Sequence, residues 1–175
     1  MTAPADPGTD IRRLMRYTAW ADARLLQALQ ALPAEVLHTP RLALLGGALD
    51  VMGHCLLIDQ VWRAHLERSA HGFASRIPQA CTPLAQLQAL QAESDRWYTD
   101  YADALDAQRQ QEVLRFDFID GGSGAMSRGD ILLHVANHKS FHRGCVVVLI
   151  DLAGHRPPVL DLPVYLRGGD GVPCT

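Results

Sequence analysis

Residues 134–144, which read HVANHKSFHRG, place three histidines four residues apart. Each four-residue step turns about 40° around an α-helix, so the rings of His134, His138 and His142 project from one face. Apolar residues lie on both sides of this string, at 131–133 and 146–150. The string therefore predicts a long helix whose histidine-bearing face points at least partly into a protein interior.

Three more long helices are predicted from apolar residues that recur at three- and four-residue steps. Leu32-Pro33 ends the first of them, because proline disfavours helix in the residue that precedes it. Together with the histidine-bearing helix, the predicted spans are residues 10–32, 44–68, 82–105 and 127–152.

Two of these helices carry recognisable start signals. Thr82 and Pro83 are typical of a helix cap followed by a proline at the first helical position, where its missing N–H costs nothing. Ser127, with Asp130 three residues later, resembles a capping box at the start of the histidine-bearing helix.

A short β-hairpin is predicted between the third and fourth helices. From Val113 to Ile119 the apolar residues alternate with period two, and the turn-rich residues 120–124 follow. Ala125 and Met126 are expected on the return strand. The expected fold class is therefore all-α, a four-helix bundle with a short β-hairpin between helices three and four.

The length of 175 residues suits one compact domain. We place it at residues 10–168, with a flexible tail at 1–9 and a second tail at 169–175. The segment from residue 155 onward is rich in proline and glycine, so we expect it to wrap the bundle as irregular chain.

Charge and composition argue against several classes of partner. The net charge is −3 and the basic residues are scattered, which disfavours nucleic-acid binding. The longest apolar run, residues 145–150, is too short to span a bilayer, and the first ten residues lack the features of a signal peptide. We therefore expect a cytoplasmic protein with no membrane partner, whose four unpatterned cysteines are free thiols: Cys55, Cys81, Cys145 and Cys174.

The histidine string also suggests a metal site. Two imidazoles one helical turn apart can bind one cation, and a third ligand would then come from another helix. His54, in an apolar part of the second helix, is the natural candidate. The alternative is that the string faces solvent and that His54 is a core histidine hydrogen-bonded to a carbonyl or to a tyrosine.

Three segments together resemble the DinB family of metal-binding four-helix bundles: YTAWAD at 17–22, GHCLLIDQVW at 53–62 and LLHVANHKSFHRG at 132–144. The resemblance spans nearly the whole chain. It implies a metal triad of His54, His138 and His142, with His134 outside it. Three imidazoles accept several divalent transition metals, of which zinc or nickel is expected first and iron or copper next.

Three residues near these histidines have open roles. Cys145 stands where the family usually has Gln, and either approaches the metal or packs as a small residue. Asp50 either supports the site or caps the second helix. Arg143 either holds a substrate carboxylate or pairs with a carboxylate of a neighbouring helix.

The resemblance also implies an activity, because the wider superfamily includes metal-dependent transferases of low-molecular-weight thiols. A thiol S-transferase acting on a small-molecule substrate is therefore the first hypothesis. A metal-dependent hydrolase would need a general base, for which the sequence offers Asp50, Asp59 or Glu67. A non-catalytic, metal-stabilised binding or dimerisation module is the third, and a homodimer is expected in any case. Three tryptophans are candidates for a substrate pocket or for core packing: Trp20, Trp62 and Trp97.

Overall fold

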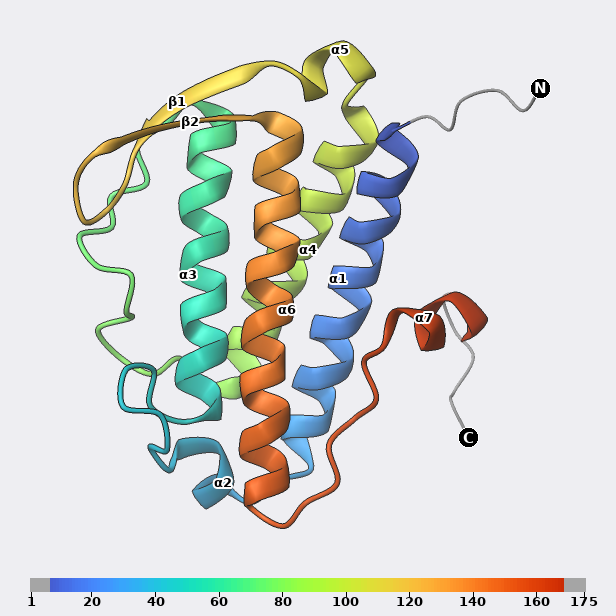
Figure 1. The fold of residues 1–175 in the computed structure, drawn as a ribbon. Helices are drawn as coiled ribbons and strands as arrows, with labels where there is room; N and C mark the ends of the chain where they lie inside the picture. The colour runs from blue at the N-terminus through green and yellow to red at the C-terminus, as the bar shows by residue number, and fades with distance from the viewer. Residues whose placement is uncertain (1–6, 169–175) are drawn as a thin grey trace.

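The computed structural model describes residues 7–168, and four long helices packed side by side form its body (Figure 1). These helices are α1 (Pro7–Gln30), α3 (Ala48–Glu67), α4 (Leu84–Ala104) and α6 (Arg128–Leu152). α1 contacts α4 and α6, and α3 contacts the same two helices. The predicted all-α four-helix bundle is confirmed.

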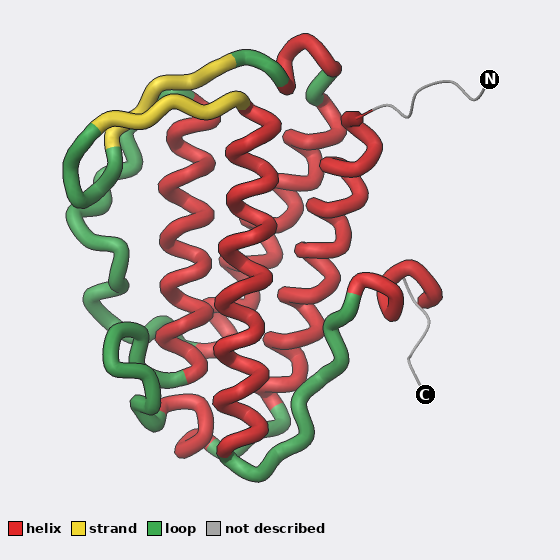
Figure 2. Tube along the Cα trace, viewed as in Figure 1, coloured by secondary structure: helices red, strands yellow, loops and turns green. Residues whose placement is uncertain are grey.

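The predicted hairpin is confirmed as well and lies across one end of the bundle (Figure 2). Its strands are β1 (Val113–Asp117) and β2 (Ser123–Ser127), which pair in antiparallel fashion. Phe116 pairs with Gly124, where a β-carbon would come within 2.8 Å of the Phe116 ring. Glycine at this position lets the aromatic ring cross the partner strand and cover the bundle end.

α6 begins as the sequence predicts. The Ser127 side chain accepts a hydrogen bond from the backbone N–H of Asp130, so it satisfies a donor that the first helical turn leaves unpaired. Because Ser127 is also the last residue of β2, the hairpin leads directly into the helix that carries the histidine string.

Other helix starts differ from the prediction. α1 begins at Pro7, three residues earlier than expected, whereas residues 1–6 and the predicted tail at 169–175 lie outside the described residues. α3 begins at Ala48 rather than near residue 44, because Gly46 adopts a φ of +74° and closes a turn back to Leu42. Thr82 is not the cap of α4, since Pro83 takes that position without a side-chain hydrogen bond.

Three short helices lie outside the predicted spans: α2 (Ala34–His38), α5 (Ala107–Gln110) and α7 (Leu162–Gly168). The expectation of a wholly irregular C-terminal segment is thus wrong for α7. The ring of Tyr165 in α7 packs on Tyr17 and Trp20 of α1, with centroid distances of 5.9 and 5.6 Å. These contacts join residues far apart in the sequence, so the local hydrophobic pattern of residues 155–168 does not predict α7.

The described helices include none whose length and apolar character would let it cross a membrane.

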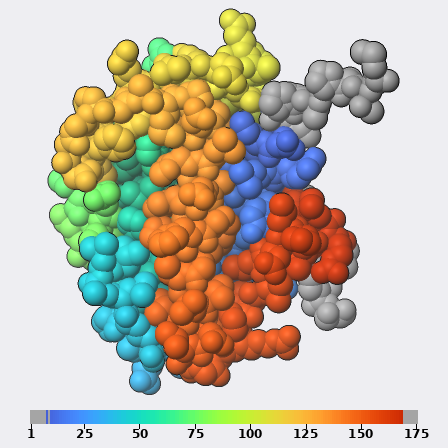
Figure 3. Space-filling view, in the orientation of Figure 1, coloured from blue at the N-terminus to red at the C-terminus, as the bar shows by residue number. Residues whose placement is uncertain are grey.

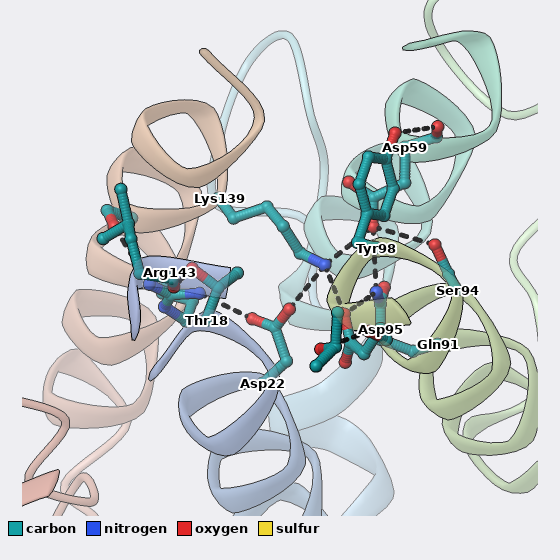
Figure 4. A network of polar contacts seen from close by, with 12 residues as sticks. Thr18, Asp22, Asp59, Gln91, Ser94, Asp95, Tyr98, Lys139 and Arg143 are labelled. Carbon is teal, nitrogen blue, oxygen red and sulfur yellow. Dashed lines mark hydrogen bonds and ion pairs between the residues drawn. The ribbon is translucent and has the colours of Figure 1, made fainter. Parts of the chain in front are cut away.

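The apolar core consists of two clusters, one towards each end of the bundle. One includes Trp62 and Phe116 beneath the hairpin, and the other includes Leu49 and Val146 at the opposite end. Between them lies a layer of buried charged residues, drawn in Figure 4.

Lys139 of α6 is the centre of this charged layer. Its Nζ atom lies 2.6 Å from Asp22 Oδ2, 2.7 Å from Asp59 Oδ2 and 2.7 Å from Asp95 Oδ1. The three carboxylates come from α1, α3 and α4 respectively, so one ammonium group contacts every other long helix of the bundle (Figure 4). The ammonium group donates hydrogen bonds to Asp59 and Asp95 and forms an ion pair with Asp22, so its buried charge is compensated.

Burial alone would lower the pKa of Lys139, but the three carboxylates outweigh it and raise that pKa well above its usual value. Burial raises the pKa of Asp95 to about 7, against the opposing attraction of Lys139. Arg143 adds a second cation, with its guanidinium donating to Asp22 at 2.8 Å. Two cations therefore face three carboxylates, and the raised pKa of Asp95 limits the excess negative charge.

Candidate metal site

Three histidines from two helices converge on the side of the bundle where α3 and α6 meet. His54 lies on α3, and His138 and His142 lie one turn apart on α6. His54 Nε2 is 3.2 Å from His138 Nε2, and the His54 and His142 ring centroids are 4.7 Å apart. Each residue offers one ring nitrogen, and these nitrogens all lie within 4.8 Å of one another. The structure thus brings together the three histidines that the sequence analysis named.

The backbone outside the helices orients the first of these rings. His54 Nδ1 lies 2.6 Å from the carbonyl oxygen of Arg76, which can only accept a hydrogen bond. Nδ1 therefore carries the proton, and Nε2 keeps a lone pair directed at the other two histidines. This pattern, a backbone carbonyl that fixes the tautomer of a ligating imidazole, is common in metal sites.

The ring nitrogens of the other two histidines also suit a cation. Buried Nδ1 atoms of His138 and His142 make no hydrogen bond to any described residue. Two nitrogens bound to zinc at about 2.0–2.1 Å with a tetrahedral angle would lie about 3.3 Å apart, close to the separation of the His54 and His138 Nε2 atoms. The three residues are so placed that they can hold one metal ion.

All three imidazoles are neutral near pH 7, as metal ligands must be. Burial lowers the pKa of His54. Burial and the neighbouring histidines lower the pKa of His138 to about 3, and burial and His54 lower that of His142 to about 4.

A cavity of about 500 Å³ opens beside the triad and reaches the surface. Side chains of α3 and α6 form its walls, and the segment before α3, the 68–83 connection and the hairpin turn surround its mouth. Figure 3 shows α6 along the middle of this face, with α3 and the 68–83 connection on one side and α1 with the C-terminal segment on the other.

His134 lies outside the triad, as the resemblance implied. Its ring centroid is 6.0 Å from that of His138 and 4.7 Å from that of Trp62, and it lines the cavity. Burial lowers its pKa, so it presents a neutral ring. Trp62 lines the same cavity, whereas the other two candidate tryptophans pack elsewhere: Trp20 against Tyr17 and Tyr165, and Trp97 against Tyr98 and Tyr101.

The residues with open roles turn out to be structural. Arg143 is buried and donates to Asp22, so of its two open roles the structure supports pairing with a carboxylate of a neighbouring helix, and it is not among the residues that line the cavity. Asp50 accepts a hydrogen bond from the Gly47 N–H at 2.9 Å and caps α3. Cys145 is half-buried against the apolar cluster that includes Leu49 and Val146, at the end of the bundle opposite the hairpin. Of its two open roles, this contact supports packing as a small residue.

The carboxylates considered as general bases are also committed elsewhere. Asp59 binds Lys139 in the charged layer, and Glu67 pairs with Arg63 at 3.1 Å on the surface. Of the described residues that line the cavity, Asp120 alone carries a carboxylate, and it pairs with Arg76 at 3.2 Å.

Sequence reasoning missed the charged layer and most of the cavity wall. A signal for the layer exists, because Asp22, Asp59 and Lys139 each occupy a core-facing position in an apolar helix pattern. The cavity wall has no such signal, since apolar residues in a helix look alike whether they fill a core or line a pocket.

Comparison with known proteins agrees with this architecture. Residues 1–170 match the model of the DinB family. The chain is also similar to "Protein DinB" of Bacillus subtilis (strain 168), with 22% identity over 158 residues that cover 88% of this chain and 92% of that protein. Since the family match spans nearly the whole chain, this protein belongs to the DinB family.

Proposed function

We propose that this chain is a metal-dependent enzyme in which His54, His138 and His142 bind one divalent transition metal, zinc or nickel. The observation that carries the proposal is the opening of a cavity beside a group of three neutral imidazoles. Among the described residues the group has three members, and structural zinc sites usually have four protein ligands whereas catalytic sites have three.

The reaction we propose is transfer of a low-molecular-weight thiol to an electrophile. A bound divalent metal would lower the pKa of the thiol and hold its sulfur as thiolate. The sulfur would form a bond to carbon of the electrophile, the leaving group would depart with the bonding electron pair, and the thiol proton would pass to solvent. The carbonyl oxygen of Arg76 supports this reaction by orienting His54, and the cavity beside the triad supports it by offering room for the electrophile.

Two alternatives are less well supported. Hydrolysis needs a general base, and Asp50, Asp59 and Glu67 all have other partners. A metal-stabilised binding module without turnover is consistent with the triad alone, but it assigns no role to the cavity that opens beside the triad.

Metal content is the first test. Tag-free wild-type protein should carry about one metal ion per chain by elemental analysis, and His138→Ala should carry almost none. His134→Ala is the matched control, because it removes a histidine one turn away on the same helix and should keep the metal. If the wild-type protein stays metal-free after incubation with zinc or nickel, the metal site does not exist.

Activity is the second test. Metal-loaded wild-type protein and His134→Ala should conjugate a thiol to a chromogenic aryl halide faster than the uncatalysed reaction, and His138→Ala should not. A metal-loaded protein that is inactive with every thiol offered would favour the non-catalytic module.

A further inference from the structure

The side chains around the cavity mouth are unusually apolar for a surface. Of the eleven large apolar side chains that are exposed among the described residues, four line this cavity. They come from four separate segments of the chain and are Leu44, Ile77, Phe118 and Phe141. Their exposed fractions run from 42% for Ile77 to 73% for Leu44. Because four exposed apolar side chains gather at one cavity mouth, this surface is suited to binding an apolar ligand.

The interior of the cavity continues this character. Ile58, Val61 and Trp62 of α3 form one wall. Phe141 stands beside the triad, with its ring 5.0 Å from that of His142. A ligand that enters the cavity and reaches the triad therefore contacts aliphatic and aromatic side chains from the mouth to the histidines.

Charged groups in the lining are few and already paired. Arg76 and Asp120 are the charged residues among the described lining, and their 3.2 Å ion pair makes the mouth neutral overall. If a ligand placed two carboxylates inside the cavity, at most one could reach a metal at the triad, and the other would lose water without gaining a free cation, which is costly.

We infer that this cavity binds molecules with an uncharged, preferably aromatic body and at most one metal-binding donor group directed at the triad. Its volume of about 500 Å³ lies within the range of about 300–1,000 Å³ usual for small-molecule sites. As far as it concerns the reaction, this inference rests on the proposed function. In that reaction the electrophile shares the cavity with the sulfur and the adjoining part of the thiol, so a charge close to the sulfur is disfavoured, whereas a charged end of a longer thiol stays in solvent outside the mouth.

A metal-independent experiment tests the apolar character. N-phenyl-1-naphthylamine, an uncharged dye whose fluorescence rises in apolar surroundings, should bind metal-free protein saturably at one site. Phe118→Ser should weaken this binding by up to about tenfold, because it removes a large apolar side chain from the mouth. Val159→Ser is the matched control, since both side chains are 45% exposed and Val159 lies outside the cavity lining.

Phe118 also packs on Phe116, with ring centroids 5.2 Å apart, so its loss can disturb the hairpin. Ile77→Ser, in the 68–83 connection, is therefore the second variant and should weaken dye binding in the same direction. Absence of saturable binding, or equal effects of the cavity variants and Val159→Ser, would overturn the inference.

A second experiment tests the donor group. In cobalt-substituted protein, phenylmethanethiol should produce the thiolate-to-cobalt absorption band at a concentration at least several-fold lower than 2-sulfanylethanesulfonate, an anionic thiol. Equal affinities would contradict the inference. Failure of the chain to bind any metal would sink the proposed function alone, because the dye experiment needs no metal.

Discussion

Lys139 Nζ lies 2.6 Å from Asp22 Oδ2 in the interior of the bundle, where it ties α6 to α1. The same ammonium group also contacts Asp59 and Asp95, so α6 is bound to all three other long helices at one level. Lys139 directly follows His138 in the chain. The contact of Lys139 with Asp59 therefore holds α6, which carries two of the three histidines, against α3, which carries the third.

Removal of the Lys139 charge should strongly destabilise the fold. Lys139→Met leaves three carboxylates buried with Arg143 as their remaining cation, and we expect a loss of about 3–5 kcal/mol in the free energy of unfolding. Urea denaturation at pH 7 measures it. Arg16→Met is the control, because its pair with Asp103 is exposed and should contribute less than about 1 kcal/mol. Equal stability of the two variants would show that the charged layer is not required.

Asp95 should give the stability a characteristic pH dependence. Burial raises its pKa from 3.8 to about 7, so between these values the folded chain holds the proton more tightly than the unfolded chain. This group therefore makes the free energy of unfolding fall as the pH rises from about 4 to about 7. Asparagine does not titrate, so Asp95→Asn should gain stability relative to wild type across that interval.

Urea denaturation of both proteins at several pH values between 3 and 8 measures this difference. Asp103→Asn, at an exposed position, serves as the control for replacing a carboxylate by an amide. A difference between Asp95→Asn and wild type that stays constant with pH would contradict the prediction.

Asp50 should matter for stability and not for the metal. Its carboxylate caps α3 through the Gly47 N–H, and loss of a helix cap typically costs about 0.5–2 kcal/mol. Asp50→Ala should therefore lower the free energy of unfolding and keep the metal content of wild type. His138→Ala, by contrast, should lose the metal. If Asp50→Ala loses its metal while remaining folded, the carboxylate supports the site after all.

Chelation should lower the thermal stability of metal-loaded protein. An ion that binds the folded chain alone adds about 2.7 kcal/mol at a free concentration one hundred times its Kd. Differential scanning fluorimetry with and without a chelator measures the resulting fall in Tm. His138→Ala should show no such fall, and a chelator effect of equal size in that variant would place the metal elsewhere.

The chain pattern alone predicted the four long helices and the hairpin, because each depends on local periodicity and on cap residues such as Ser127. Helix starts were less well predicted. α3 begins only after the turn at Gly46, and α4 begins at Leu84 because Pro83 takes the cap position that Thr82 was expected to hold. α7 escaped prediction since its stability comes from Tyr165 packing on α1.

The residues of the candidate site were likewise predicted in part from the sequence and decided in part by the structure. Spacing along one helix placed His138 and His142 on a common face. The apolar setting of His54 made it the candidate for the third ligand, and the resemblance to the DinB family then implied the full triad. Arg143 was open between two roles, and the buried carboxylate of Asp22 decided it.

The sequence by itself determined which residues can form helices, where two histidines must share a face, and which family the chain resembles. The helices and the shared face follow from periodicity within single segments, and the resemblance follows from short motifs in three segments. Tertiary structure alone decided that His54 meets His138 at 3.2 Å, that Lys139 lies among three carboxylates, and that the apolar residues around Trp62 line a cavity. The physical reason is that these features arise between segments distant in the chain, where helix packing sets the distances and local spacing does not.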